Sequence, residues 1–207
     1  MTDKPYLPTP EALIKAKKQP DVVDVPDRVV LALEGAGGPE EPGFSAAVQA
    51  LYAVAYALRF ARKKAGEPVF KVGVLEGEWR AARSDQPILE VPARSDWRWR
   101  AQMCVPSDVT KGELAAIVEA VTTKRGAKLE GSEEAERIQL TKIKGARFAR
   151  VLHLGPYATE QESFAKIDEM LAKEGLSREP WHVEAYLSDP SRTAPEKLKT
   201  ALLTKLK

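Results

Sequence analysis

The sequence predicts an α+β protein in which one order of elements occurs twice. Segments rich in β-branched residues alternate with stretches whose apolar side chains recur at three- and four-residue steps. Each half contains strands on both sides of a helix, and a further helix separates the halves. An apolar content of 43% and a charged content of 30% are typical of a globular chain with a substantial core.

The first half begins with an N-terminal arm over residues 1–20, which contains four prolines and a short helical stretch, Glu11–Lys18. Two extended segments follow at Val22–Pro26 and Arg28–Leu33, because valine and leucine dominate both. The glycine-rich run Gly35–Pro39 ends the second segment. It lacks the Gly-Lys-Ser/Thr ending of a phosphate-binding loop, so we do not expect phosphate binding there.

A long amphipathic helix is predicted from Phe44 to Lys64, with Gly66 ending it. Its most apolar part, Ala46–Ala61, is interrupted by Gln49 and Arg59 and is too short to span a bilayer. We therefore expect a core helix and no membrane partner.

Two strands complete the first half, at Val69–Leu75 and at Trp97–Val105. The helix between the halves is predicted from Val109 to Thr123, and Ser107 is available to cap it.

The second half repeats this order. Strands are predicted at Ile138–Ile143 and Arg147–Leu154, joined by a short turn. A helix opens at Ala158 or Thr159 and runs to Ala172, with Phe164, Ile167 and Leu171 on its apolar face. A strand at Trp181–Leu187 and the segment Pro195–Leu206 close the chain.

Composition excludes several classes of function. The net charge of +2 is a small difference between 32 basic and 30 acidic residues, and no long basic block suggests a nucleic-acid partner. The one cysteine, Cys104, and two distant histidines make a metal site improbable, and we expect no metal and no cofactor. Cys104 lies in an apolar strand and is interpreted as a core residue. The chain lacks an apolar signal segment, so we expect a cytoplasmic protein.

The strand Trp181–Leu187 carries the most informative pattern. Alternation puts Trp181, Val183, Ala185 and Leu187 on one face and His182, Glu184 and Tyr186 on the other. The first face is an ordinary core face. The second combines a carboxylate with an imidazole and a phenol, although a single glutamate in a strand is more often a solvated surface residue.

Aromatic side chains are concentrated at predicted strand ends. Trp79 lies beside Glu76, Trp97 and Trp99 share one face of a strand, and Tyr157 follows the strand that carries His153. Such parts suit a pocket for a flat, apolar or cationic molecule. The alternative for each tryptophan is that it fills the core, and for His153 a structural hydrogen bond is the more common use.

Four segments together resemble one protein family. They are Leu75–Trp79, Trp97–Met103, His153–Tyr157 and Glu184–Pro190. In this order they are similar to the motifs of the GyrI-like small-molecule-binding family, in its standalone branch, which includes hydrolases of cyclopropane-bearing genotoxins. Two positions differ from the family pattern: Arg80 replaces an aromatic residue, and Trp181-His182-Val183 replaces a His-His pair before the glutamate.

The resemblance implies two β-α-β-β repeats related by a pseudo-twofold axis. They would form an antiparallel sheet with helices on one side and a central groove. The expected organisation is an arm at 1–20 and a domain at 21–207, with repeats at about 21–105 and 137–207 and a linking helix at about 107–125. The expected partner is a small molecule, and the expected state is a monomer or homodimer.

The resemblance also implies a central acidic residue in the groove, which Glu184 matches. We expect Glu184, Tyr157 and Tyr186 as catalytic residues. The expected ligand-binding residues are Trp79, Glu76, Trp97, Trp99, His182, His153 and Tyr56. One hypothesis is a hydrolase in which Glu184 acts as general base on water that opens a strained cyclopropane. A second is a protein that binds lipophilic or cationic drugs without turnover. A third is a protein-interaction module of the gyrase-inhibitor kind, for which the sequence shows no surface signature. The sequence does not separate the first two.

Overall fold

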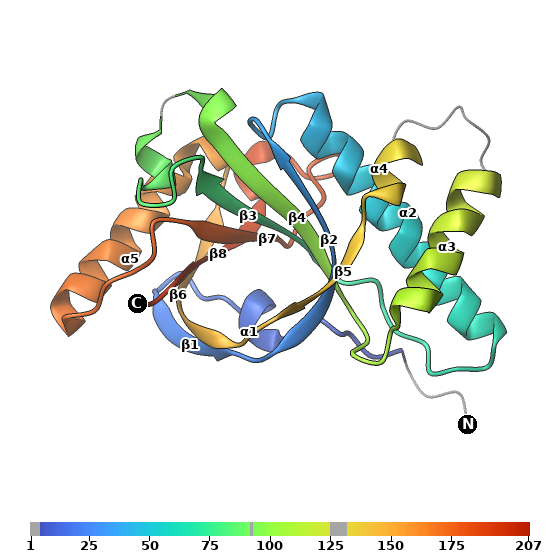
Figure 1. Cartoon of the computed structure of the whole chain (residues 1–207). Coiled ribbons are helices and arrows are strands. Elements are labelled where there is room, and N and C mark those ends of the chain that lie inside the picture. The colour runs from blue at the N-terminus through green and yellow to red at the C-terminus, as the bar shows by residue number, and fades with distance from the viewer. Residues whose placement is uncertain (1–4, 92, 125–131) are drawn as a thin grey trace.

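A computed structural model describes residues 5–91, 93–124 and 132–207. Its centre is one antiparallel sheet of eight strands in the order β1-β6-β8-β7-β3-β4-β2-β5 (Figure 1). The strands are β1 Asp21–Val25, β2 Arg28–Ala36, β3 Leu75–Ala81, β4 Trp97–Val105, β5 Gln139–Ile143, β6 Ala146–Leu154, β7 His182–Tyr186 and β8 Lys199–Lys205. The α-helices are α1 Glu11–Ile14, α2 Pro42–Lys64, α3 Lys111–Lys124, α4 Ser132–Glu136 and α5 Glu160–Glu174. The 3₁₀ turns within the described residues are η1 Ile88–Glu90, η2 Arg94–Asp96, η4 Tyr157–Thr159 and η5 Pro195–Lys197.

The strand order is that of two related halves. β2-α2-β3-β4 forms the first β-α-β-β unit and β6-α5-β7-β8 the second, and β3 pairs with β7 at the middle of the sheet. The predicted α+β class and its two repeats are confirmed. Because β3 and β7 are the central strands, residues facing the same side of this pair come from both halves.

Helices α2 and α5 cover one face of the sheet. The apolar side of α2, including Leu51 and Leu58, packs on the first half. Phe164 and Ile167 of α5 pack on β6 and β8 of the second half. In Figure 1, α3 and α4 lie beside α2, and α5 lies at the other end of the sheet. The two main helices therefore leave the central strands between them.

Helix α2 is two residues longer at its start than the sequence predicts. Its 23 residues and a mean hydropathy of 1.3 over its most apolar window would by themselves suit a membrane span. Leu51, Val54 and Leu58 are nevertheless fully buried against the sheet. This helix belongs to the core.

The opposite face of the sheet is covered by the arm that precedes β1. Leu13 is buried there against β7 and β8 residues such as Val183 and Leu203. The helix predicted over Glu11–Lys18 is confined to α1, because the chain then runs beside β6, where Lys17 O accepts a hydrogen bond from Leu152 N (2.7 Å). The predicted helix was therefore too long.

The strand predicted at Val69–Leu75 is also wrong, because β3 begins only at Leu75. Residues before it cross the back of the sheet and pair with the arm through a single bridge, Tyr6 to Phe70. The arm is rich in proline, which cannot donate ladder hydrogen bonds, so a regular strand pair does not form there.

The connections β1–β2 and β5–β6 meet each other. β1 pairs with β6 of the second half, and β5 pairs with β2 of the first, so each half supplies an edge strand to the other. At the meeting point the Asp27 carboxylate accepts hydrogen bonds from Gly145 N (2.8 Å) and Lys144 Nζ (3.0 Å). The contact holds the two crossing connections together.

We expect Gly145→Ala to destabilise the fold by about 1–3 kcal/mol, because overpacking moves the backbone. A Cβ at this position would lie 2.7 Å from Val25 O and 3.0 Å from Asp27 N. Gly112→Ala is the matched control, since its Cβ would meet nothing closer than 4.0 Å, and should be neutral or stabilising by up to about 1 kcal/mol. Urea unfolding of both variants checks this, and equal effects would contradict the close crossing.

Candidate functional site

A cavity lies between α2 and α5, above the central strands β3 and β7. Its volume is about 1080 Å³, which is enough for a drug-sized molecule. Its walls also include η2, the start of α5 and the loop that follows β7. Both halves of the chain therefore build this one cavity.

Strand β7 places its three polar side chains on the cavity floor. His182, Glu184 and Tyr186 line the cavity, while Val183 and Ala185 face the back of the sheet, as the alternation predicts. The neighbouring strand aligns Gly77 with Glu184 and Trp79 with His182. The carboxylate thus lies at the junction of the two repeats.

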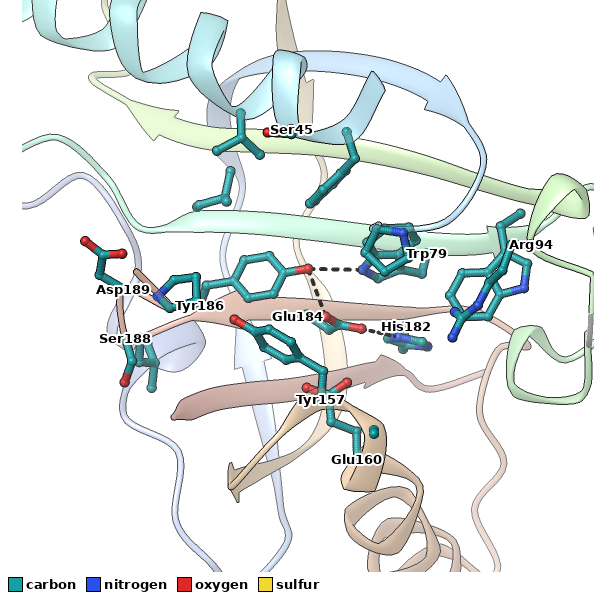
Figure 2. Close-up of a pocket in the computed structure, with 18 of the residues that line it drawn as sticks. Ser45, Trp79, Arg94, Tyr157, Glu160, His182, Glu184, Tyr186, Ser188 and Asp189 are labelled. Carbon is teal, nitrogen blue, oxygen red and sulfur yellow. Dashed lines mark hydrogen bonds and ion pairs between the residues drawn. The ribbon is translucent and has the colours of Figure 1, made fainter. Parts of the chain in front are cut away.

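Glu184 is held from both sides. His182 Nε2 lies 2.9 Å from Glu184 Oε1, and the Tyr186 hydroxyl donates to Oε2 at 2.8 Å (Figure 2). Because a carboxylate oxygen accepts, His182 Nε2 carries the proton in this pair. Trp79 Nε1 donates in turn to the Tyr186 hydroxyl at 3.3 Å. The two donors fix the orientation of the carboxylate.

Gly77 makes room for this chain of hydrogen bonds. A Cβ there would lie 2.8 Å from the Tyr186 hydroxyl and 2.9 Å from Trp79 Nε1. The glycine opposite Glu184 is therefore required by close approach of two aromatic side chains.

A second carboxyl group faces Glu184. Glu160, at the start of α5, is buried, and its Oε1 has no donor among the described groups. Burial raises the pKa of Glu160 far above its ordinary value, and the adjacent charge of Glu184 raises it further. Both effects favour the protonated form of Glu160 at neutral pH. The pair shares one proton and carries one negative charge at neutral pH.

The sequence reasoning missed Glu160. It occupies the apolar stripe of α5, four residues before Phe164 and seven before Ile167, where a carboxylate would be costly unless it had a partner. A glutamate on the apolar side of a helix was therefore the feature of the sequence that could have identified Glu160 as a site residue.

The two tyrosines near the pair remain neutral. Burial, followed by the charge of Glu184, raises the pKa of Tyr186 well above its usual value. The same two causes, with a contribution from Glu160, raise the pKa of Tyr157 to about 12. The rings of Tyr157 and Tyr186 meet edge to face at 5.9 Å. Tyr186 directs its proton to Glu184, so Tyr157 has the hydroxyl that is free to contact a ligand.

One wall of the cavity is aromatic. The ring of Trp79 lies 4.9 Å from Phe44 and 5.7 Å from Trp97. Arg94, which the sequence reasoning also missed, places its guanidinium 4.0 Å from the centre of the Trp97 ring. Tyr56 lines the cavity from α2. This wall suits a flat ligand.

Glu76 does not reach the cavity. It lies on the opposite face of β3, fully buried, where Arg28 Nη2 (3.0 Å) and Gln102 Nε2 (2.8 Å) donate to its Oε2. The expectation that Glu76 contacts a ligand fails because strand alternation separates it from Trp79. Its role in the structure is to compensate the charge of Arg28.

Trp99 and His153 are also placed outside the cavity. Trp99 opposes Trp79 in the sheet but lies beneath Phe44, and its Nε1 donates to Ala36 O at 3.1 Å. His153 is buried, with Ser163 Oγ 2.9 Å from its Nδ1 and Pro156 O 3.1 Å from its Nε2. Both are held by structural contacts, which were the alternatives considered for them.

Among the residues that the structure describes, no three histidine, cysteine, aspartate or glutamate side chains are grouped to hold a metal ion.

The family of this chain follows from a match to a known sequence family. A model described as the GyrI-like small molecule binding domain matches residues 104–207, which is half of the chain. The chain belongs to the GyrI-like small-molecule-binding family. This confirms the predicted family, and binding of a small molecule is the function that membership supports. No curated protein sequence matches this GyrI-like protein.

Solved structures extend the likeness to nearly the whole GyrI-like chain. A conserved uncharacterised protein of Listeria innocua is 28% identical, with a TM-score of 0.82, over 93% of this chain and 94% of its own. A hydrolase of the same organism is 25% identical, with a TM-score of 0.84, over 99% and 100%. A further Listeria innocua hydrolase structure is 28% identical, with a TM-score of 0.78, over 93% of each chain.

The protonated state of Glu160 makes stability depend on pH. Its ordinary pKa is 4.5, so above that pH the folded protein holds one more proton than the unfolded chain, and stability falls as pH rises until Glu160 ionises. The slope from this group is at most about 1.4 kcal/mol per pH unit. Glu160→Gln removes the titrating group at nearly unchanged size and should flatten the decline of Tm between about pH 6 and pH 9.

Glu162→Gln, on the exposed side of the same helix, is the control and should retain the wild-type slope. If Glu160→Gln and wild type lose stability in parallel across this range, Glu160 is not protonated in the folded protein.

Proposed function

We propose that this protein is a hydrolase of electrophilic, planar small molecules, and specifically that it adds water to a cyclopropane ring conjugated to a dienone. The observation that carries the proposal is the Glu160–Glu184 pair at the floor of an aromatic cavity. One carboxyl is ionised and oriented by two donors, and its neighbour carries a proton.

In the proposed reaction Glu184 is the general base. It takes a proton from a water molecule while the water oxygen forms a bond to the cyclopropane methylene carbon. The carbon–carbon bond to the ring breaks, and its electron pair moves through the dienone to the carbonyl oxygen, which becomes a phenolate. Protonation of the phenolate gives a phenol with a hydroxyalkyl arm, so the net change is addition of one water.

The surrounding groups have separate roles. Tyr157 donates to the developing phenolate, since its raised pKa keeps the proton in place. His182 and Tyr186 are positioning residues, because they act through Glu184. Glu160 stays neutral, so only one negative charge faces the substrate.

The aromatic wall holds the ligand flat and excludes water. Trp97 is half-buried and can stack on a ligand, which contributes about 0.5–1.5 kcal/mol to binding. Trp79 is 1% exposed and supports the Trp97 ring from behind, with 5.7 Å between the ring centres. Support also comes from the two Listeria innocua hydrolases, whose folds cover nearly the full chain at 25% and 28% identity.

A second candidate function is binding of lipophilic cations without turnover. It is favoured by the same aromatic wall next to a single negative charge, because cations bind to ring faces and to carboxylates. In that case Glu184 is a counter-charge and no product forms.

The deciding experiment follows the chromophore of a spiro-cyclopropyl dienone during incubation with the protein. We expect catalytic turnover, and Glu184→Gln should lower kcat about 10²- to 10⁴-fold while binding is retained. Glu162→Gln is the matched control outside the cavity and should behave as wild type.

Stoichiometric binding without product would reject the hydrolase and favour the binder. The binder would also be favoured if the wild-type protein does not react with the dienone and Glu184→Gln lowers the affinity for cationic dyes.

A further inference from the structure

Helix α2 presents a regular face to the cavity. Ser45, Gln49, Tyr52 and Tyr56 line it at steps of three and four residues, as one side of a helix must. The next member of this series is Phe60, which lies one turn beyond the cavity wall. The face that forms the cavity therefore continues outside it.

Three rings form a continuous row along this face. The Tyr52 and Tyr56 rings are 6.4 Å apart and inclined by 25°, and the Tyr56 and Phe60 rings are 6.4 Å apart and inclined by 27°. We call Tyr52, Tyr56 and Phe60 the aromatic row. Its exposure rises away from the cavity, from 37% to 47% and 57%.

The exposed large hydrophobic side chains are concentrated near the cavity. Six large hydrophobic side chains are exposed among the described residues: Tyr6, Tyr52, Tyr56, Phe60, Leu154 and Tyr157. Three of them form the aromatic row, and a fourth, Tyr157, lines the same cavity. Single exposed hydrophobic residues are ordinary, but a contiguous group at a cavity mouth marks a binding surface.

The outer end of the row is held in place. The Arg59 guanidinium lies 5.5 Å from the centre of the Phe60 ring, and Arg59 Nε donates to Phe70 O at 2.9 Å. The ring is thus supported by a fixed cation on a rigid helix. Little ordering would be needed for a ligand to bind there.

We propose that the aromatic row is a second subsite, which binds a planar aromatic extension of the molecule whose head occupies the cavity. The preferred ligand is then elongated and has several conjugated rings. This deepens the proposed function and depends on the cavity being its ligand site. Tyr52 and Tyr56 belong both to the aromatic row and to the cavity wall. A protein or membrane bound to the row would therefore close the opening of the cavity. A ligand that extends out of the cavity would instead pass through this opening.

The test compares two dyes of one chemistry and different length. The bis-benzimidazole Hoechst dye is elongated, and hydroxyphenyl-benzimidazole is its single-unit fragment. Fluorescence titration should show that Phe60→Ala weakens the long dye about five- to tenfold and the fragment less than twofold, as expected for one lost stacking contact. Tyr6→Ala removes an exposed aromatic outside the row and should change neither affinity.

An unchanged ratio of the two affinities in Phe60→Ala, with the fragment still bound, overturns the subsite and leaves the proposed hydrolase intact. Binding of neither dye counts against the cavity itself as well as against the subsite. The same variant is assayed by flotation with phosphatidylglycerol vesicles and by analytical ultracentrifugation. If it loses vesicle binding or self-association while the dye ratio is unchanged, the row serves a membrane or a second copy, and the proposal is wrong.

Discussion

The site depends on one constraint: two carboxyl groups, Glu160 and Glu184, are buried next to each other and together carry only one negative charge. Two ionised carboxylates side by side in a cavity would be strongly unfavourable, so one of them retains its proton. The ionised member, Glu184, is compensated by hydrogen bonds from His182 and Tyr186. The aromatic surroundings that make the charge costly are the same ones that give a flat ligand its binding surface.

The sheet explains why these groups meet. Glu184 comes from β7 and Trp79 from β3, which belong to different halves of the chain and pair at the centre of the sheet. Helices α2 and α5 pack on opposite halves of the sheet, and the cavity lies between them above this central pair. A fold built from two such units therefore creates its cavity at their junction, whatever side chains line it.

Much of the fold and part of the site follow from local pattern. Alternation along Trp181–Leu187 was sufficient to put Glu184 and Tyr186 on one face, because a strand has a fixed period. Alternation also excludes Glu76 from that face once β3 is known to begin at Leu75.

Glu160 and Trp99 could not be placed in this way. The proximity of Glu160 to Glu184 depends on how α5 packs on the sheet, and the burial of Trp99 depends on Phe44 of α2. Such contacts between distant segments leave only indirect marks in a sequence, such as a carboxylate on an apolar stripe.

The exchange of β1 and β5 between the halves affects how the protein can fold. Each unit completes its outer edge with a strand from the other, so a half that forms early still exposes an unpaired edge. Pairing β1 with β6 joins residues more than a hundred positions apart, and contacts of such long range slow folding. A separated half would therefore keep an unpaired strand edge, which is a site for aggregation.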